Sequence, residues 1–190
     1  DVKTFILTGI IMNFLASVVI DSLPNNLVSN SYNSLMNVAV TGNWLQVLLI
    51  TGVITPVVEE LIFRYGITKI IKQNKFFKKP DVSSIYISAF VFGLVHFNII
   101  QSTYAFIFGI ILAYVYIKTD NLLSSILIHI GVNASSVLYS FMPVMLQNIC
   151  LIVMSIIFFI IVIRNILVIR NNSSHSNVNN FLSYLLYQTK

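Results

Sequence analysis

The chain has 190 residues, of which 57% are hydrophobic and only 9% are charged, and its mean hydropathy is +0.87. Ordinary globular domains carry about 25% charged residues, so this composition excludes a soluble globular protein and predicts an integral membrane protein. The net charge of +5 would suit nucleic acid or a membrane surface, and its distribution along the chain decides for the membrane. The single cysteine, Cys150, excludes an internal disulfide framework.

Six apolar segments are long enough, or nearly so, to span the roughly 30 Å hydrocarbon core of a bilayer as helices. They lack the alternation and the short length of barrel strands, so we expect an all-α fold, a polytopic transmembrane helix bundle with about six spanning helices. The segments are 4–20, 45–70, 82–100, 103–118, 121–141 and 149–169.

The domain organisation is predicted to be simple, because the chain shows no internal repeat and no second domain. We expect a single membrane-embedded domain over residues 1–170, with the functionally important core at about 45–141. A cytoplasmic tail at 171–190 follows, which is polar and has a weakly amphipathic end.

The basic residues predict an orientation. If the N-terminus is cytoplasmic and crossings alternate, all eleven lysines and arginines lie on or toward the cytoplasmic side. The one charged residue in the predicted outer loops is then Asp21. This positive-inside pattern predicts a multi-pass protein of the cell membrane with both termini in the cytoplasm. The loop from Lys69 to Lys79 could bind nucleic acid, but beside a bilayer we expect it to contact anionic lipid instead.

The segment 45–70 contains three charged residues, Glu59, Glu60 and Arg64. A charged side chain at the bilayer centre costs roughly 2.5–3.5 kcal/mol on insertion scales, so such residues usually have a function. Glu60 and Arg64 are four residues apart and can pair on one helix face. Glu59 is rotated by about 100° from Glu60 and is left for another task. Pro56 removes a backbone hydrogen bond before the pair, and we expect a kink that opens a cavity.

Two histidines lie on the following segments. His96 follows Phe92 by four residues, and His129 precedes Asn133 by four, so each pair is expected to project from one side of a helix. Short turns join these helices, which makes it easy to pack them around Glu59. A carboxylate, two imidazoles and an amide in a dry pocket are what amide hydrolysis requires, because a base must activate water and donors must stabilise the oxyanion.

Each of these residues also has a structural interpretation. Glu60 and Arg64 can form an ion pair that only holds the fold, Phe92 can be a packing residue, and Asn133 can make an interhelical hydrogen bond. The sequence has neither a glycine-flanked serine elbow nor an H-E-x-x-H pattern, which argues against a serine triad and a soluble metalloprotease. Four hydroxyl side chains are expected to bond back onto their own helices, namely Thr55, Ser88, Ser124 and Ser136.

Three short motifs, taken together and in this order, resemble those of the CPBP family of intramembrane proteases. That family includes the CAAX-processing enzymes of the Rce1 type and bacterial bacteriocin-processing and self-immunity proteins. The resemblance covers roughly residues 45–141, about half of the chain. The motifs are Glu59-Glu60-x-x-x-Arg64, Phe92-x-x-x-His96 and His129-x-x-x-Asn133.

The resemblance implies an intramembrane endopeptidase that hydrolyses a peptide bond of a membrane-associated peptide or protein. By position, Glu59 would activate the attacking water together with His96. His129 and Asn133 would stabilise the oxyanion. The supporting residues would be Glu60, Arg64 and Phe92.

The cofactor stays unknown at this point, either none or a divalent metal such as zinc. Two histidines and a glutamate can form a zinc site with an open position, which here would consist of Glu59, His96 and His129. The same three residues can act without metal, with glutamate as the base, and we favour this second interpretation.

Two other functions fit the same sequence. A bacteriocin immunity protein could protect its host by binding or occlusion on the same scaffold, without catalysis. A proton- or metal-coupled transporter could use intramembrane glutamate and histidine as a relay, although the two halves of the chain show no detectable repeat. The expected partners of the endopeptidase are the bilayer and a peptide or protein substrate at the membrane, with no nucleic acid.

Overall fold

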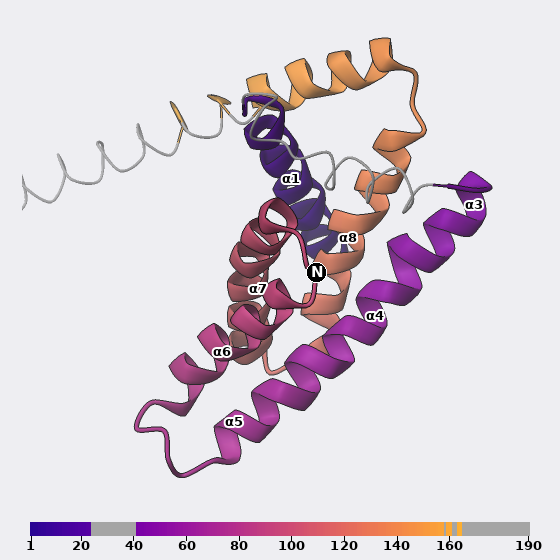
Figure 1. Ribbon diagram of the computed structural model, residues 1–190. Coiled ribbons are helices and arrows are strands. Elements are labelled where there is room, and N and C mark those ends of the chain that lie inside the picture. Colours follow the sequence, from indigo (N-terminus) through magenta and orange to yellow (C-terminus); the bar gives the residue numbers. More distant parts are fainter. Residues whose placement is uncertain (24–40, 158, 161–162, 165–190) are drawn as a thin grey trace, which may run out of the picture. The chain divides into compact units, whose positions relative to one another are not determined.

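The computed structural model describes residues 1–23, 41–157, 159–160 and 163–164. Within these residues the chain consists of helices and short turns and contains no strand (Figure 1). This confirms the predicted all-α fold. The chain divides into two compact units, Asp1–Gln147 and Asn148–Lys190, and the candidate site lies within the first. The predicted tail at 171–190 lies outside the described residues.

Helices occupy all six predicted segments, as far as the structure describes them. Helix α1 spans Val2–Asp21, and an unbroken helical stretch then runs from Trp44 to Gln73. Its parts, with η denoting π-helix, are α3 (Trp44–Val47), η1 (Leu48–Ile54), α4 (Thr55–Glu60), η2 (Leu61–Thr68) and α5 (Lys69–Gln73). The remaining helices are α6 (Pro80–Leu94), α7 (Ile99–Thr119), α8 (Leu122–Ser140) and an apolar helix at Val144–Ile157.

Four of the described helices are long and apolar enough to cross a membrane, namely α1, the stretch from Trp44 to Gln73, α7 and α8. The two other predicted segments form shorter apolar helices, Pro80–Leu94 and Val144–Ile157, and the second of these segments extends beyond the described residues. Helix α6 has only 15 residues, which corresponds to about 22 Å and is less than the hydrocarbon thickness.

The predicted span 82–100 is wrong as a single helix. Helix α6 ends at Leu94 and α7 begins at Ile99, so the turn comes several residues earlier than predicted. His96 therefore lies in this turn and not on a spanning helix.

Asn98 explains why the turn lies here. Its side-chain oxygen accepts hydrogen bonds from the backbone N–H groups of Ile100 and Gln101, at 3.1 and 3.3 Å. Asparagine is among the favoured N-cap residues, so Asn98 determines where α7 starts. Phe97 beside it has a left-handed backbone with φ of 53°, which is rare for a bulky residue and breaks the helical path.

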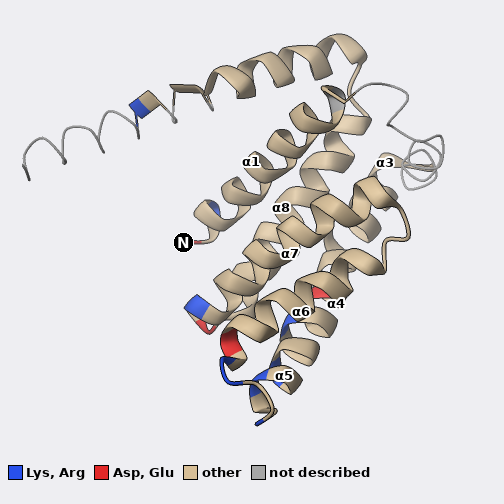
Figure 2. Cartoon of the chain, turned by 60° about the vertical axis from the view of Figure 1, so that its left-hand side comes forward, with Lys and Arg blue, Asp and Glu red and all other residues tan. Residues whose placement is uncertain are grey.

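Small residues let the helices approach closely, as expected for a membrane bundle. A Cβ added to Gly9 of α1 would collide with the backbone carbonyl of Ile128 in α8, and one added to Gly131 of α8 would collide with that of Ile6. Figures 1 and 2 both show α1 running beside α8. These contacts place α8, which carries His129 and Asn133, in the middle of the packed helices.

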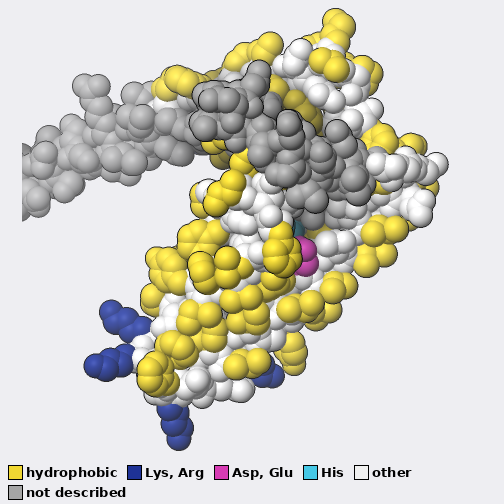
Figure 3. All heavy atoms as spheres, in the orientation of Figure 1, with side chains coloured by type: hydrophobic (Ala, Val, Ile, Leu, Met, Phe, Trp, Pro, Cys, Tyr) yellow, Lys and Arg dark blue, Asp and Glu magenta, His cyan; other side chains and the backbone are white. Residues whose placement is uncertain are grey.

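The distribution of side chains is that of a membrane protein. Large apolar side chains cover much of the face shown in Figure 3, where they can contact lipid. Polar side chains are buried inside instead, which in a membrane bundle marks a functional site. The buried polar residues of the segment 60–129 are Glu60, Arg64, Thr68, Ser84, Ser88, Asn98, Ser124, Ser125 and His129.

Candidate functional site

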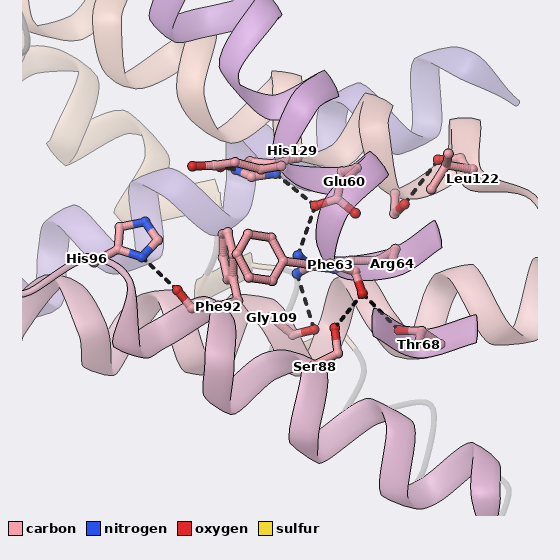
Figure 4. Close-up of polar contacts among 12 residues, drawn as sticks. Glu60, Phe63, Arg64, Thr68, Ser88, Phe92, His96, Gly109, Leu122 and His129 are labelled. Atoms are coloured by element: carbon pink, nitrogen blue, oxygen red, sulfur yellow. Dashed lines mark hydrogen bonds and ion pairs between the residues drawn. The ribbon is translucent and has the colours of Figure 1, made fainter. Parts of the chain in front are cut away.

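The carboxylate of Glu60, at the end of α4, is the centre of the buried polar cluster. Its Oε1 lies 3.2 Å from Nη1 of Arg64 and 2.9 Å from Nδ1 of His129 (Figure 4). All three side chains are buried. The predicted pairing of Glu60 with Arg64 is therefore confirmed. The bond from His129 to Glu60 was not predicted, because it joins residues far apart in the sequence.

Arg64 connects three helices. Its Nη2 donates to the backbone carbonyl of Gly109 in α7 at 3.4 Å, and its guanidinium carbon lies 4.5 Å from the ring centroid of Phe92 in α6. The cation–π contact with Phe92 favours the positive charge in a site without water. Gly109 was missed by the sequence analysis. A Cβ there would lie 2.9 Å from Cα of Ala89, so the glycine permits the close approach of α6 and α7.

Glu59 contacts His129 from the other side. Its Oε2 lies 3.4 Å from Nε2 of His129, so the imidazole is held between two carboxylates. The Glu59 side chain is 23% exposed, whereas that of Glu60 is fully buried. Figure 3 shows an acidic and a histidine side chain reaching the surface together beside apolar side chains. Glu60 thus has a fixed internal partner, and Glu59 is the glutamate that a substrate or water can reach.

His96 reaches the same site through Phe92. Its Nδ1 donates to the backbone carbonyl of Phe92 at 2.7 Å, which leaves Nε2 as the acceptor of the neutral ring (Figure 4). The Phe92 ring meets both imidazoles edge-on, with centroids 5.0 Å from His96 and 5.6 Å from His129. Of the two imidazoles, only that of His129 lies within ion-pairing distance of the Glu59 carboxylate in the described structure.

Asn133 is placed by a contact that the sequence did not specify. Its Nδ2 donates to the backbone carbonyl of Thr51 in η1 at 3.2 Å. This is its one hydrogen bond within the described part of the chain. Asn133 thus makes the interhelical hydrogen bond of the structural interpretation, and its second amide hydrogen remains available.

Two hydroxyl groups donate hydrogen bonds to the backbone next to Arg64. Ser88 of α6 and Thr68 of η2 both donate to the backbone carbonyl of Phe63, at 2.9 and 3.1 Å (Figure 4). The expectation that Ser88 bonds back onto its own helix is therefore wrong. In a π-helix the hydrogen bonds shift from four to five residues, which frees carbonyls for such side-chain donors. The bond from Ser88 ties α6 to η2 directly behind Arg64.

The residue types at the site suit a zinc ion, but the side chains are too far apart to bind one together. Glu59, His96 and His129 are zinc-ligand types, and the Nδ1 of each histidine is engaged by a fixed oxygen, as is usual for metal-bound histidines. Nevertheless, no group of three His, Cys, Asp or Glu side chains in the described part of the chain is close enough to hold a metal ion.

A family model described as "Type II CAAX prenyl endopeptidase Rce1-like" matches residues 41–135. The match covers half of the chain and contains all three motifs. The chain belongs to the Rce1-like family. No curated protein and no solved structure matches the chain. Membership in the Rce1-like family confirms the resemblance carried by the motifs and makes the protein a CAAX-type intramembrane protease in general terms.

The buried ion pair predicts a large loss of stability when one partner is removed. We expect Arg64→Met to lower the free energy of unfolding in detergent micelles by about 3–5 kcal/mol, because it leaves the Glu60 carboxylate buried without its cation. Lys72→Met is the matched control, since it removes an ion pair of Lys72 with Asp81 (3.1 Å) in which both side chains are exposed. It should change the same quantity by less than about 1 kcal/mol. Equal losses in the two variants would contradict the buried network.

Proposed function

We propose that the protein is an intramembrane endopeptidase that hydrolyses a peptide bond of a membrane-associated peptide or protein. The observation that carries the proposal is the contact between the partly exposed Glu59 and the buried His129, which come from separate helices. The ring of Phe92 contacts both His129 and His96. The match to the Rce1-like family supports proteolysis as the class of reaction.

Glu59 and His96 are the groups that activate water in this proposal. The Glu59 carboxylate accepts a proton from the water while Nε2 of His96, which is free of other partners in the described structure, accepts a hydrogen bond from it and orients it. The water oxygen attacks the carbonyl carbon of the scissile bond. The proton held by Glu59 then passes to the leaving amine, so the glutamate is regenerated when the C–N bond breaks.

His129 and Asn133 stabilise the negative charge that develops on the carbonyl oxygen. His129 is held between two carboxylates, which fixes the orientation of its ring. The second amide hydrogen of Asn133 is a further donor. Glu60 and Arg64 support His129 from behind, and Phe92 separates the two imidazoles.

The side chain of Glu59 offers the sharpest test of this mechanism. We expect Glu59→Gln, which keeps the size but removes the base, to reduce cleavage of a membrane peptide by at least about 100-fold. Cleavage is measured by mass spectrometry on purified protein in liposomes. Asp81→Asn is the matched control, because it removes an exposed carboxylate at the start of α6 and should leave cleavage unchanged.

The same assay separates the rival functions. Retained cleavage with Glu59→Gln would contradict the mechanism. If the wild type cleaves no peptide and Glu59→Gln still protects its host from a bacteriocin, the protein is an immunity protein that acts by binding. Metal analysis of the same preparations decides the cofactor, since stoichiometric zinc that is lost in His96→Ala and His129→Ala would identify a metal-dependent enzyme.

We further propose that the lysine-rich end of the helices faces the cytoplasm and contacts anionic lipid. Figure 2 shows the lysines of the first unit gathered toward one end, at the start of α1, the loop between α5 and α6, and the end of α7. The positive-inside rule places this end, and with it the N-terminus, in the cytoplasm. Phe76 in the loop is 85% exposed, which suits insertion among lipid headgroups.

Anionic lipid is expected to stabilise the protein through the loop between α5 and α6. In nanodiscs, replacing part of a zwitterionic lipid by phosphatidylserine should raise the Tm of the wild type. The triple variant Lys75→Gln, Lys78→Gln and Lys79→Gln should lose most of that rise, because these exposed lysines face the headgroups. Lys118→Gln at the end of α7, which removes one lysine of the same end outside the loop, should lose only a small part of the rise. An unchanged rise in the triple variant would contradict the proposed lipid contact.

A further inference from the structure

A backbone carbonyl of η1 lacks its usual partner because of Pro56. The N–H of Thr55 donates to the carbonyl of Ile50, five residues earlier, as is usual in a π-helix. The next carbonyl in this pattern, that of Thr51, would take its donor from residue 56. Proline has no N–H, so the helix itself cannot satisfy Thr51. In a membrane bundle such a carbonyl must find a donor elsewhere.

Asn133 is that donor. Its Nδ2 reaches from α8 to the carbonyl oxygen of Thr51 at 3.2 Å. The two helices are in close contact at this point, because a Cβ added to Gly52 would lie 3.2 Å from Cα of Ala134. Gly52 and Pro56 are both buried, so water has little access to the carbonyl.

Asn133 and His129 lie one turn apart on α8 and contact the same helical stretch. His129 bonds to Glu60 and meets Glu59, and Asn133 bonds to Thr51, about two turns before them. Two contacts along one line fix how that stretch is rotated and shifted against α8. Both are needed to keep Glu59 in front of His129.

We propose that Asn133 is a positioning residue that supplies the hydrogen bond denied by Pro56 and thereby holds Glu59 in register with His129. The proposal rests on the proposed function where it concerns catalytic rate. The hydrogen bond itself can be tested without it. Its consequence is that the hydrogen bond from Asn133 to Thr51 is needed only while residue 56 is proline, because an N–H at position 56 would satisfy the Thr51 carbonyl from within the helix.

A double-mutant cycle on the purified full chain in nanodiscs tests this dependence. Asn133→Ala alone is expected to lower the Tm by about 3–8 °C, since it leaves a buried carbonyl unsatisfied. In a Pro56→Ala background the same change should lower the Tm by less than a third of that value. Ser135→Ala is the matched control on α8, because its hydroxyl donates only to carbonyls of its own helix, those of Gly131 and Val132. It should have the same small effect in both backgrounds.

Cleavage provides the second readout. Asn133→Ala is expected to lower kcat with little change in KM. The kcat of the double variant should be at least threefold higher than that of Asn133→Ala, and the loss that remains relative to Pro56→Ala is the oxyanion contribution. Equal Tm losses with and without Pro56, or equal kcat in the single and double variants, would overturn the proposal. If Asn133→Ala fails to accumulate, the double variant should accumulate again, and its failure to do so would also overturn it. Absence of cleavage by the wild type would contradict the proposed function and leave the Tm cycle as the test of Asn133.

Discussion

The structure depends on a carboxylate that is fully buried between helices. Glu60 is fully buried, and a lone charge there would be far too costly for the bundle to hold. It is stabilised by Arg64 from its own helix and by His129 from α8, while Arg64 is in turn held by the carbonyl of Gly109 and the ring of Phe92. One ion pair thus determines how four helical segments meet.

This network explains why the two neighbouring glutamates differ in role. The contact with Glu60 sets the orientation of His129, and the opposite ring nitrogen then faces Glu59, which is partly exposed. The shortness of α6 adds the third group. The turn that follows that helix bonds His96 to the backbone carbonyl of Phe92, and the Phe92 ring also meets His129. The buried ion pair and the residues that we propose to be reactive are therefore adjacent parts of a single arrangement.

Local features could be predicted from the sequence, and contacts between helices could not. The apolar runs predicted the helices, and the spacing of Glu60 and Arg64 predicted their ion pair, because both depend on residues close together in the chain. The three motifs predicted the family. The end of α6 was missed, although Asn98 before an apolar run is a recognisable N-cap signal. The partners of Ser88 and Asn133 could not have been found, since both contact carbonyls next to π-helical turns that no local pattern reveals.

The most direct measurement is of the distance from each ring nitrogen of His129 to the glutamate side chains. Glu59 and Glu60 are the only glutamates in the chain, and it has three histidines. Protein with labelled glutamate carboxyl carbons and labelled histidine nitrogens can therefore be studied in bilayers by solid-state dipolar dephasing, with His129→Gln to assign the signals. Our account predicts that both ring nitrogens of His129 are dephased, Nδ1 by Glu60 and Nε2 by Glu59. Dephasing of Nδ1 alone, or of neither nitrogen, would contradict the site.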